Sequence, residues 1–529
     1  MMDLYAFSRE YVSKLLGPSG VPVRVLLLDG HTTPLISLVS TQSELLKQDV
    51  YLVDRLESTR DKLRTLGALI FCSVESLDLL VAEIGSPKYK EYRVVFNGVV
   101  SKSALERLAE ADDFGVIKEV WECYLSYGVL NSLLFVPEIV DLNIREGSGW
   151  EKHHLDHSVK SIVAVSLSAK VKPTICWENT KLNEKLSQAL SYEFKNQTFD
   201  GFSGGSLIIL DRRNDPVTPL LFPWTYQSMV HDVIGIDSSS NTVKLGYLNV
   251  SNELETVVLN SSEDSFWNDT MYLNFGDLST KLKEYVEDYK NKTKTNSNIN
   301  SIKDMKFFLE NYPQFKKLSL GLSKHMLLSG EIDKRINRDK IWDISEFQQH
   351  LCSNTDQSGF IHDLETINGI KGSNLFTSTA CLFALKYEGH SELITAINSW
   401  PCADLIKKCI RIYGKQSRSG SISLFNHNNG QQEGNWLQQM TKKQHEGNVF
   451  MQTKPRLAVI LENLKQGKLD GFKGSISNKN KIILYMVGGV TYEEVRIVEE
   501  FRKKEKMDVV IGSTSIINTD MFINELKEL

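Results

Sequence analysis

Short apolar runs that alternate with helix-spaced segments constrain the fold of this chain more than any other feature. Strands are predicted over residues 23–29, 49–55, 68–73 and 92–96, with helices between them over residues 73–84 and after residue 96 over 102–109. Nearly continuous apolar runs are typical of strands that are buried on both faces. Strands alternating with helices therefore predict a mostly parallel sheet with helices on both of its faces.

A second set of the same kind lies further along the chain. Residues 161–168 and 206–211 are predicted as strands around a helix over 180–194. Much later, residues 481–487 and 508–512 are predicted as strands around a helix over 492–504. The simplest layout lets the late strands complete a sheet begun near residue 140. The fold class expected is then α/β plus all-α, with two parallel-sheet domains and a long insertion.

The predicted insertion, roughly residues 235–450, is mainly helical in pattern. Leu278, Leu282, Tyr285 and Val286 recur at helical spacing. Residues 291–301 and 414–447 interrupt the pattern with Asn, Ser, Gly and Gln, and both are interpreted as mobile surface loops. We find no internal repeat that would indicate a solenoid.

Charge and cysteine content exclude several classes of protein. Lys plus Arg is 61 and Asp plus Glu is 66, so the net charge of −5 excludes a strongly basic nucleic-acid binder. The seven cysteines are scattered without a CxxC motif, which favours reduced thiols over disulfides or a structural zinc site. No apolar run approaches the roughly 20 residues that cross a bilayer. A location at a membrane would therefore depend on a partner.

Two small motifs contain residue types found in ligand sites, but a structural interpretation is favoured for both. Gly488 and Gly489 follow a predicted strand, yet the segment matches neither known phosphate-loop pattern, so a tight turn is favoured. His153, His154 and His157 could face one metal on a helix, but no other ligands lie nearby in the sequence. We therefore expect no metal and no cofactor, while a nucleotide-dependent α/β enzyme stays as an alternative.

The densest charged motif is DRRNDP, residues 211–216. Its carboxylates could hold a metal or move protons at the end of a strand. The favoured interpretation is structural: Asp211, Arg212 and Asp215 form ion pairs at a domain junction, and Pro216 fixes an extended exit. We find no nucleophile elbow, zinc-protease motif or kinase signature, which favours binding over catalysis.

Long motifs resemble one known family over nearly the whole chain. They are LLLDGHTTPLISLVSTQSELL at 26–46, LDRRNDPVTPLLFPWTYQSMVHDVIGI at 210–236, YPQFKK at 312–317, LSKH at 322–325, GGVTYEE at 488–494 and GSTSI at 512–516. They resemble the Sec/Munc (SM) family of syntaxin-binding proteins. The amino-acid sequences of these motifs are most similar to those of the vacuolar protein sorting branch of that family, which acts in endosomal and trans-Golgi traffic.

The resemblance implies an arch-shaped molecule that is not an enzyme. Its domains would be residues 1–135, residues 136–235 completed by 452–529, and a helical insertion over 236–451. The implied partners are a syntaxin-type SNARE and the assembled SNARE complex, with an endosomal tether or Rab effector as a further candidate. The protein would be a cytoplasmic monomer, held peripherally on endosome, trans-Golgi or vacuole membranes through SNAREs. A branch serving the plasma membrane, the early secretory path or a tethering complex is the alternative.

The resemblance also implies two binding surfaces and a hinge. A syntaxin N-terminal peptide would lie in a groove between two helices after Phe96, lined by Leu105, Leu108, Ala109, Val116, Val120 and Glu122. Leu108 and Val116 could equally belong to the core. Lys47, Arg55 and Arg60 would face SNARE helices in the inner cleft, unless they are simply solvated. Pro313 would be a hinge in a helix, the alternative being that the helix ends at Tyr312.

Overall fold

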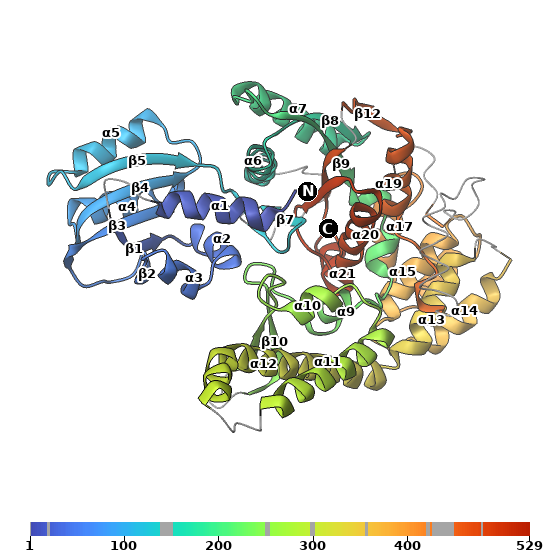
Figure 1. Cartoon of the computed structure of the whole chain (residues 1–529). Helices are drawn as coiled ribbons and strands as arrows, with labels where there is room; N and C mark the ends of the chain where they lie inside the picture. Colours follow the sequence, from blue (N-terminus) through green and yellow to red (C-terminus); the bar gives the residue numbers. More distant parts are fainter. Residues whose placement is uncertain are drawn as a thin grey trace.

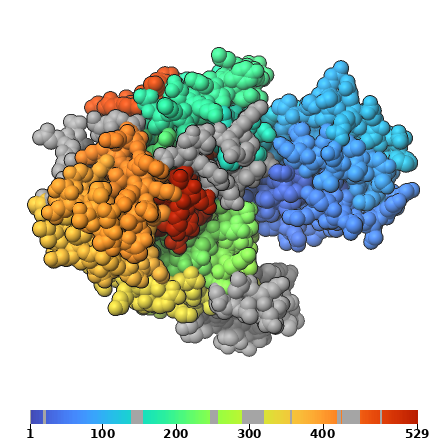
Figure 2. All heavy atoms as spheres, turned by 180° about the vertical axis from the view of Figure 1, so that it is seen from behind, coloured from blue at the N-terminus to red at the C-terminus, as the bar shows by residue number. Residues whose placement is uncertain are grey.

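The computed structural model describes residues 2–17, 22–137, 152–248, 254–296, 302–354, 358–418, 424–425, 449–477 and 480–529. Its parts form an arch: an N-terminal α/β part, a second α/β part, and a mainly helical insertion that curves back beneath the first (Figure 1). Seen from behind, the blue N-terminal part projects to one side of the molecule (Figure 2). None of the described helices combines the length and the hydropathy needed to span a bilayer.

The first sheet has the parallel order β2-β1-β3-β4-β5. Its strands are β1 (Val23–Leu28), β2 (Leu52–Arg55), β3 (Leu63–Ser73), β4 (Tyr89–Asn97) and β5 (Ile117–Cys123). The helices of this part are α1 (Leu4–Leu16), α2 (Thr32–Val39), α3 (Gln42–Lys47), α4 (Leu77–Gly85) and α5 (Lys102–Ala111). The four strands predicted in this region are confirmed, and β5 is an additional one.

Alternation along β1 shows why the first sheet is covered on both faces. Leu26 and Leu28 pack into a cluster with α1 and α2, whereas Val25 and Leu27 pack into another with α4 and α5. Successive side chains of a strand point to opposite faces, so a run that is apolar throughout needs two apolar layers. The continuous apolar run is thereby explained.

The second sheet has the order β12-β8-β9-β13-β14-β7-β6. Its strands are β6 (Tyr127–Val129), β7 (Leu134–Pro137), β8 (Val171–Glu178), β9 (Ser203–Asp211), β12 (Phe472–Gly474), β13 (Lys481–Val487) and β14 (Asp508–Ser513). The late strands β13 and β14 lie between β9 and β7, which confirms that they complete an earlier sheet. Because β6 already belongs to this sheet, the sheet begins at Tyr127, before the expected domain boundary at residue 135.

The predicted strand over residues 161–168 is wrong, because these residues form the end of helix α6 (Lys152–Ser168). The helix buries Ile162, Val163 and Val165, so its apolar residues do not mark a single stripe. The Ser166 hydroxyl donates to the carbonyl of Ile162 at 2.8 Å, which satisfies a buried polar group within the helix. A short apolar run cannot be assigned from periodicity alone when the helix is buried. The strand lies directly after it, as β8.

The remaining helices complete the second part. They are α7 (Lys181–Asn196), α8 (Val217–Leu220), α9 (Tyr226–Met229), α19 (Arg456–Gln466), α20 (Tyr492–Glu505) and α21 (Thr519–Glu528). The predicted helices over 180–194 and 492–504 are confirmed by α7 and α20. Thr491 caps α20 in a capping box with Glu494, an arrangement typical of a Thr-x-x-Glu sequence at the start of a helix.

The insertion is mainly helical, as expected, but it starts with a hairpin of β10 (Thr242–Leu248) and β11 (Leu254–Val258). Its helices include α10 (Ser265–Thr270), α11 (Phe275–Asn296), α12 (Ile302–Arg338), α13 (Ile341–Ser353), α14 (Phe360–Gly369), α15 (Phe376–Lys386), α16 (Leu393–Asn398) and α17 (Ala403–Tyr413). Helix α11 runs to Asn296, so the first half of the loop predicted over 291–301 is helical. Residues 297–301, and most of the loop predicted over 414–447, lie outside the described residues.

Candidate functional site

The candidate peptide surface lies on α5 and β5 of the first sheet. Leu105 on α5 is 37% exposed and Val120 on β5 is 40% exposed, although both are apolar. Ala109 is also exposed. Glu122 is exposed and accepts a hydrogen bond from the Val100 amide at 2.9 Å. These four residues are therefore accessible to a partner.

Two expectations about this surface need correction. Leu108 and Val116 are buried among the side chains under the sheet, so they are core residues. The expected second helix is absent from the described part of the chain, because residues 117–123 form the edge strand β5. The charged and apolar residues of IKEVWEC alternate imperfectly, and the apolar spacing of Val116 and Val120 led to the helical interpretation.

Sequence reasoning missed three exposed apolar residues in this region. Val99 and Phe114 are 65% and 66% exposed, and Trp121 is 40% exposed with the Arg93 guanidinium 5.0 Å from the centre of its ring. Val99 and Phe114 flank α5, whereas Trp121 lies on β5. The sequence signal for an exposed patch was that these large apolar residues do not fit the apolar pattern of a predicted helix or strand. Scattered exposed side chains are common, so the signal is weak without the fold.

The three candidate cleft residues differ in their exposure to solvent. Lys47, at the end of α3, and Arg55, at the end of β2, are exposed. Arg60 is not available to a partner, because its side chain is only 3% exposed and its Nη2 donates to Glu83 Oε2 at 2.7 Å. Glu83 also accepts a hydrogen bond from the Tyr92 hydroxyl at 2.7 Å. Arg60 therefore has a structural partner that lies 23 positions away in sequence.

Helix α12 contains the predicted hinge residue. The helix extends from Ile302 to Arg338, so it does not end at Tyr312 and Pro313 lies within it. Further along, Leu328, Ile332 and Ile336 are fully buried, while Leu320 and Met326 are 63% and 56% exposed. One face of α12 is therefore anchored and another presents apolar side chains. Whether Pro313 acts as a hinge stays a prediction.

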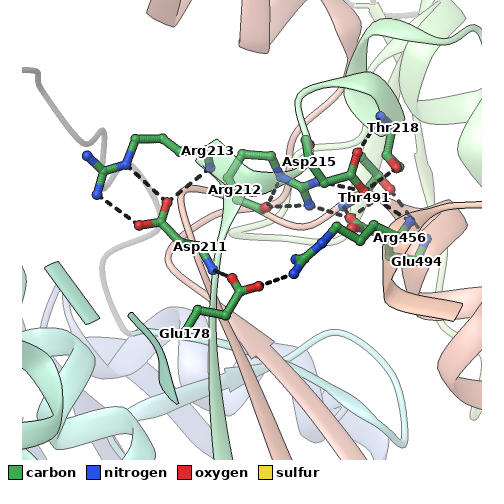
Figure 3. Close-up of polar contacts among 10 residues, drawn as sticks. Glu178, Asp211, Arg212, Arg213, Asp215, Thr218, Arg456, Thr491 and Glu494 are labelled. Atoms are coloured by element: carbon green, nitrogen blue, oxygen red, sulfur yellow. Dashed lines mark hydrogen bonds and ion pairs between the residues drawn. The ribbon is translucent and has the colours of Figure 1, made fainter. Parts of the chain in front are cut away.

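The DRRNDP motif lies at the junction where the insertion leaves the second sheet (Figure 3). Arg212, only 2% exposed, donates to the carbonyl of Gly489 at 3.0 Å and to Glu494 Oε2 at 2.5 Å. Burial alone would lower the pKa of Arg212, but the charges of Glu494 and Asp215 hold it above its ordinary value. Asp211 accepts from the Arg213 amide at 3.0 Å and from its guanidinium at 2.8 Å.

A second ion pair at this junction joins the end of β8 to the start of α19. Arg456 Nη2 lies 2.5 Å from Glu178 Oε1, and Glu178 Oε2 accepts from the Asp211 amide at 2.8 Å. Asp215 accepts from the Thr218 hydroxyl at 2.6 Å. Pro216 follows and is buried at the start of α8. These contacts are what a structural role of Asp211, Arg212, Asp215 and Pro216 requires, and that role stays a prediction about stability.

The two small ligand motifs considered from sequence show no ligand geometry among the side chains that the structure describes. Gly489 has a φ of +96°, and a Cβ there would lie 2.5 Å from Ile517 Cγ2, so the glycine serves a close approach of the backbone. Gly488 also has a positive φ. His154 and His157 lie on α6, and the side chain of His153 lies outside the described residues. In the part of the chain that is described, no three His, Cys, Asp or Glu residues form a group suited to a metal.

A small cavity beside the junction contains an unusual histidine. It offers about 70 Å³ of solvent space and is lined by Trp224, His231, Tyr492 and Thr519 among others. His231 Nδ1 accepts from the Ile236 amide at 3.1 Å, and its buried Nε2 has no partner among the described residues. Burial lowers the pKa of His231 to about 4, so the imidazole is neutral near pH 7.

Comparison with known proteins gives consistent matches over the full chain. The model of the Sec1 family matches residues 24–525. Vacuolar protein sorting-associated protein 45 of Saccharomyces cerevisiae is 38% identical, covering 96% of this chain and 94% of the relative. The rat protein of that name is 34% identical, covering 99% and 96%. The solved structure "SM Protein Vps45 in Complex with Qa SNARE Tlg2" is similar with a TM-score of 0.86 and 33% identity, covering 100% of this chain and 98% of that one.

Proposed function

Because the chain belongs to the Sec1 family of SM proteins, we propose that it binds a syntaxin-type SNARE and promotes SNARE assembly in endosomal, trans-Golgi or vacuolar traffic. One observation carries the proposal: the likeness extends over the whole chain to a Vps45 solved with the Qa SNARE Tlg2. The arch and its two α/β parts are the scaffold on which such a partner would be held. The second domain is proposed to start near Tyr127, where its sheet begins.

The proposed peptide site is the accessible part of α5 and β5. Leu105 and Val120 offer apolar surface, and Glu122 offers a carboxylate to a basic or amide group. An extended peptide gains specificity from a few side chains placed in apolar surface beside a polar edge. Leu108 and Val116 belong to the core on which α5 and β5 pack, and they are not proposed to contact the peptide.

The proposed SNARE-helix surface is the inner side of the arch. Lys47 and Arg55 are exposed cations, and SNARE faces with carboxylates would complement them. Across the opening, α12 exposes Leu320 and Met326, which suit the apolar face of an amphipathic helix. Pro313 is proposed to let α12 bend or straighten at this position.

The chain is proposed to act without catalysis and to reach its membrane through the SNARE. An endosomal tether or Rab effector is proposed as a further partner. One observation supports the absence of catalysis. Buried ion pairs lie at the carboxyl ends of β8 and β9, where α/β enzymes often bind a ligand.

A binding panel tests the proposal. The purified chain would be incubated with immobilised cytosolic regions of syntaxin-type SNAREs from the endosomal, plasma-membrane and early secretory steps. Retention by an endosomal or trans-Golgi syntaxin is expected. Retention by a syntaxin of another step alone would assign the chain to another branch. Failure to bind any of them, together with nucleotide hydrolysis by the pure protein, would overturn the proposal.

A further inference from the structure

The turn between β11 and α10, residues 259–264, contacts two parts of the arch at once. We call it the 259–264 turn. Asn260 fixes its shape: its side-chain oxygen accepts from the Ser262 amide at 2.9 Å, and its carbonyl accepts from the Asp264 amide at 3.0 Å. A turn held by its own hydrogen bonds transmits displacement better than a loose loop does.

On one side, Arg9 of α1 joins the turn to the N-terminal part. Its Nη2 donates to the Ser262 hydroxyl at 3.0 Å. Its Nε donates to the Val39 carbonyl at the end of α2 at 3.1 Å, and Nη2 lies 3.3 Å from Glu44 of α3. One guanidinium therefore connects three helices of the N-terminal part to the turn.

On the other side, Asp264 joins the turn to α12. One carboxylate oxygen caps α10 by accepting from the Trp267 amide at 3.0 Å. The other accepts from His325 Nε2 at 2.9 Å and pairs with Lys324. Burial opposes ionisation, but the hydrogen bond from His325 and the charge of Lys324 hold the pKa of Asp264 well below its usual value.

His325 extends the connection to the second α/β part. The side chain is fully buried, and burial lowers its pKa, so the imidazole is neutral near pH 7. A carboxylate can only accept, so Nε2 carries the proton that is donated to Asp264. Nδ1 is then the acceptor for the Tyr226 hydroxyl at 2.9 Å. Lys324 also donates to the Val258 carbonyl at 3.1 Å, which ties α12 to the hairpin.

Next to the turn, the N-terminal part and α12 border a cavity. Thr41, at the start of α3, and Leu320 and Gly321, on α12, line this cavity of about 500 Å³ together with the turn. A displacement of α3 therefore meets empty space rather than α12 at this place. The turn offers a bonded route around the cavity.

We propose that the 259–264 turn couples α1 and α3 to α12, so that a ligand displacing either element changes the order of the other. Leu320, Met326 and Leu327 on α12 are the exposed apolar side chains whose presentation would change. Such a coupling is a free energy shared by the two places, and it is reciprocal. It concerns contacts within this chain and holds whichever ligands bind the two surfaces.

Hydrogen exchange on the full chain tests the coupling in one direction. Arg9→Met removes the contact with Ser262, and Lys14→Met on the same helix removes only an exposed pair with Glu10. We expect exchange in peptides covering residues 319–330 to rise at least about threefold in Arg9→Met and to stay unchanged in Lys14→Met. Faster exchange confined to α1, α2 and α3 would overturn the proposal.

The reciprocal experiment starts from α12. Lys324→Met removes the cation from Asp264, whereas Lys334→Met changes an exposed lysine of the same helix. Exchange in peptides covering residues 33–47 should rise in Lys324→Met alone. No change there would overturn the proposal, and this variant decides the question if Arg9→Met fails to fold.

Discussion

The Arg456 amide donates to Asp215 Oδ2 at 3.2 Å, although the two residues are 241 positions apart in the sequence. Asp215 lies just after β9, where the chain leaves the second sheet, and Arg456 is the first residue of α19, where the chain returns. The Thr453 amide donates to Gln349 Oε1 at 2.9 Å and fastens the returning chain to α13. The chain therefore leaves the second sheet and returns to it at one place, which buried ion pairs hold together.

Arg212→Met should destabilise the protein strongly. Glu494 is fully buried, and without Arg212 its carboxylate would lose its cation in the interior. Breaking a buried pair in this way costs about 3–5 kcal/mol. Thermal unfolding followed by circular dichroism should show a lower Tm. Lys503→Met on α20, the helix that carries Glu494, is the control, because Lys503 is 70% exposed and its loss leaves no buried carboxylate without its cation in the way that loss of Arg212 does. An equal effect of both variants would contradict the structural role.

Asp211→Asn should also destabilise the fold, by about 1 kcal/mol, rather than abolish an activity. The amide keeps one acceptor for the Arg213 backbone N–H but loses the charge that pairs with the Arg213 guanidinium. Because Arg213 is 35% exposed, the ion pair itself contributes little. A Tm equal to that of the unchanged protein would count against a structural role for Asp211.

Leu105→Arg should weaken binding of a syntaxin N-terminal peptide at least tenfold, which is about 1.4 kcal/mol. The reason is that a charge would replace an apolar side chain at the proposed contact, where the peptide would desolvate it. Titration calorimetry measures the affinity. Tyr192→Arg on α7 is a suitable control, since Tyr192 is apolar in large part and 66% exposed. Undiminished affinity of Leu105→Arg would reject this site.

Pro313→Ala should change the rate of SNARE assembly and leave peptide affinity intact. Alanine restores a backbone donor within α12 and removes the tendency of proline to kink a helix. A fluorescence assay of SNARE assembly, run beside calorimetry with the peptide, separates the two effects. Loss of both together would indicate misfolding, and an unchanged assembly rate would refute the hinge.

His231→Asn should reduce the loss of stability on acidification. The native pKa of about 4 lies below the ordinary histidine pKa of about 6.5, so between these values the unfolded chain binds more protons. Stability therefore falls as the pH falls through this window, by up to about 3 kcal/mol from this residue. The asparagine oxygen can still accept from the Ile236 amide but does not titrate. Denaturant unfolding of both proteins at several pH values between 4 and 7 should show that the unchanged protein loses more stability between pH 7 and pH 4 than His231→Asn does. Parallel curves would show that His231 does not contribute.

How far the sequence predicts this molecule depends on where the determining contact lies. The strands β1, β3, β4, β9, β13 and β14 were predicted because their apolar runs are local and bounded. Helix α6 was mistaken for a strand because its burial hides the helical period. β5 was missed because it is an edge strand with charged residues.

The same reasoning applies to the candidate sites. The burial of Arg60 depends on Glu83, and that of Arg212 on Glu494, which lies 282 positions away. Composition around Arg60 looks like that of a solvated loop, so nothing local indicates its partner. Leu105 and Leu108 are alike in sequence, and only packing against the sheet distinguishes the exposed residue from the core residue.

The place of β13 in the middle of the second sheet has a consequence for protein synthesis. Strand β9 is complete by residue 211, but its neighbour β13 begins only at residue 481. While the ribosome makes the intervening segment, one edge of β9 has no partner strand. One edge of β7 is also unpaired until β14 has been made. Unpaired apolar strand edges invite aggregation. The nascent chain should therefore need chaperone protection until its last fifty or so residues emerge.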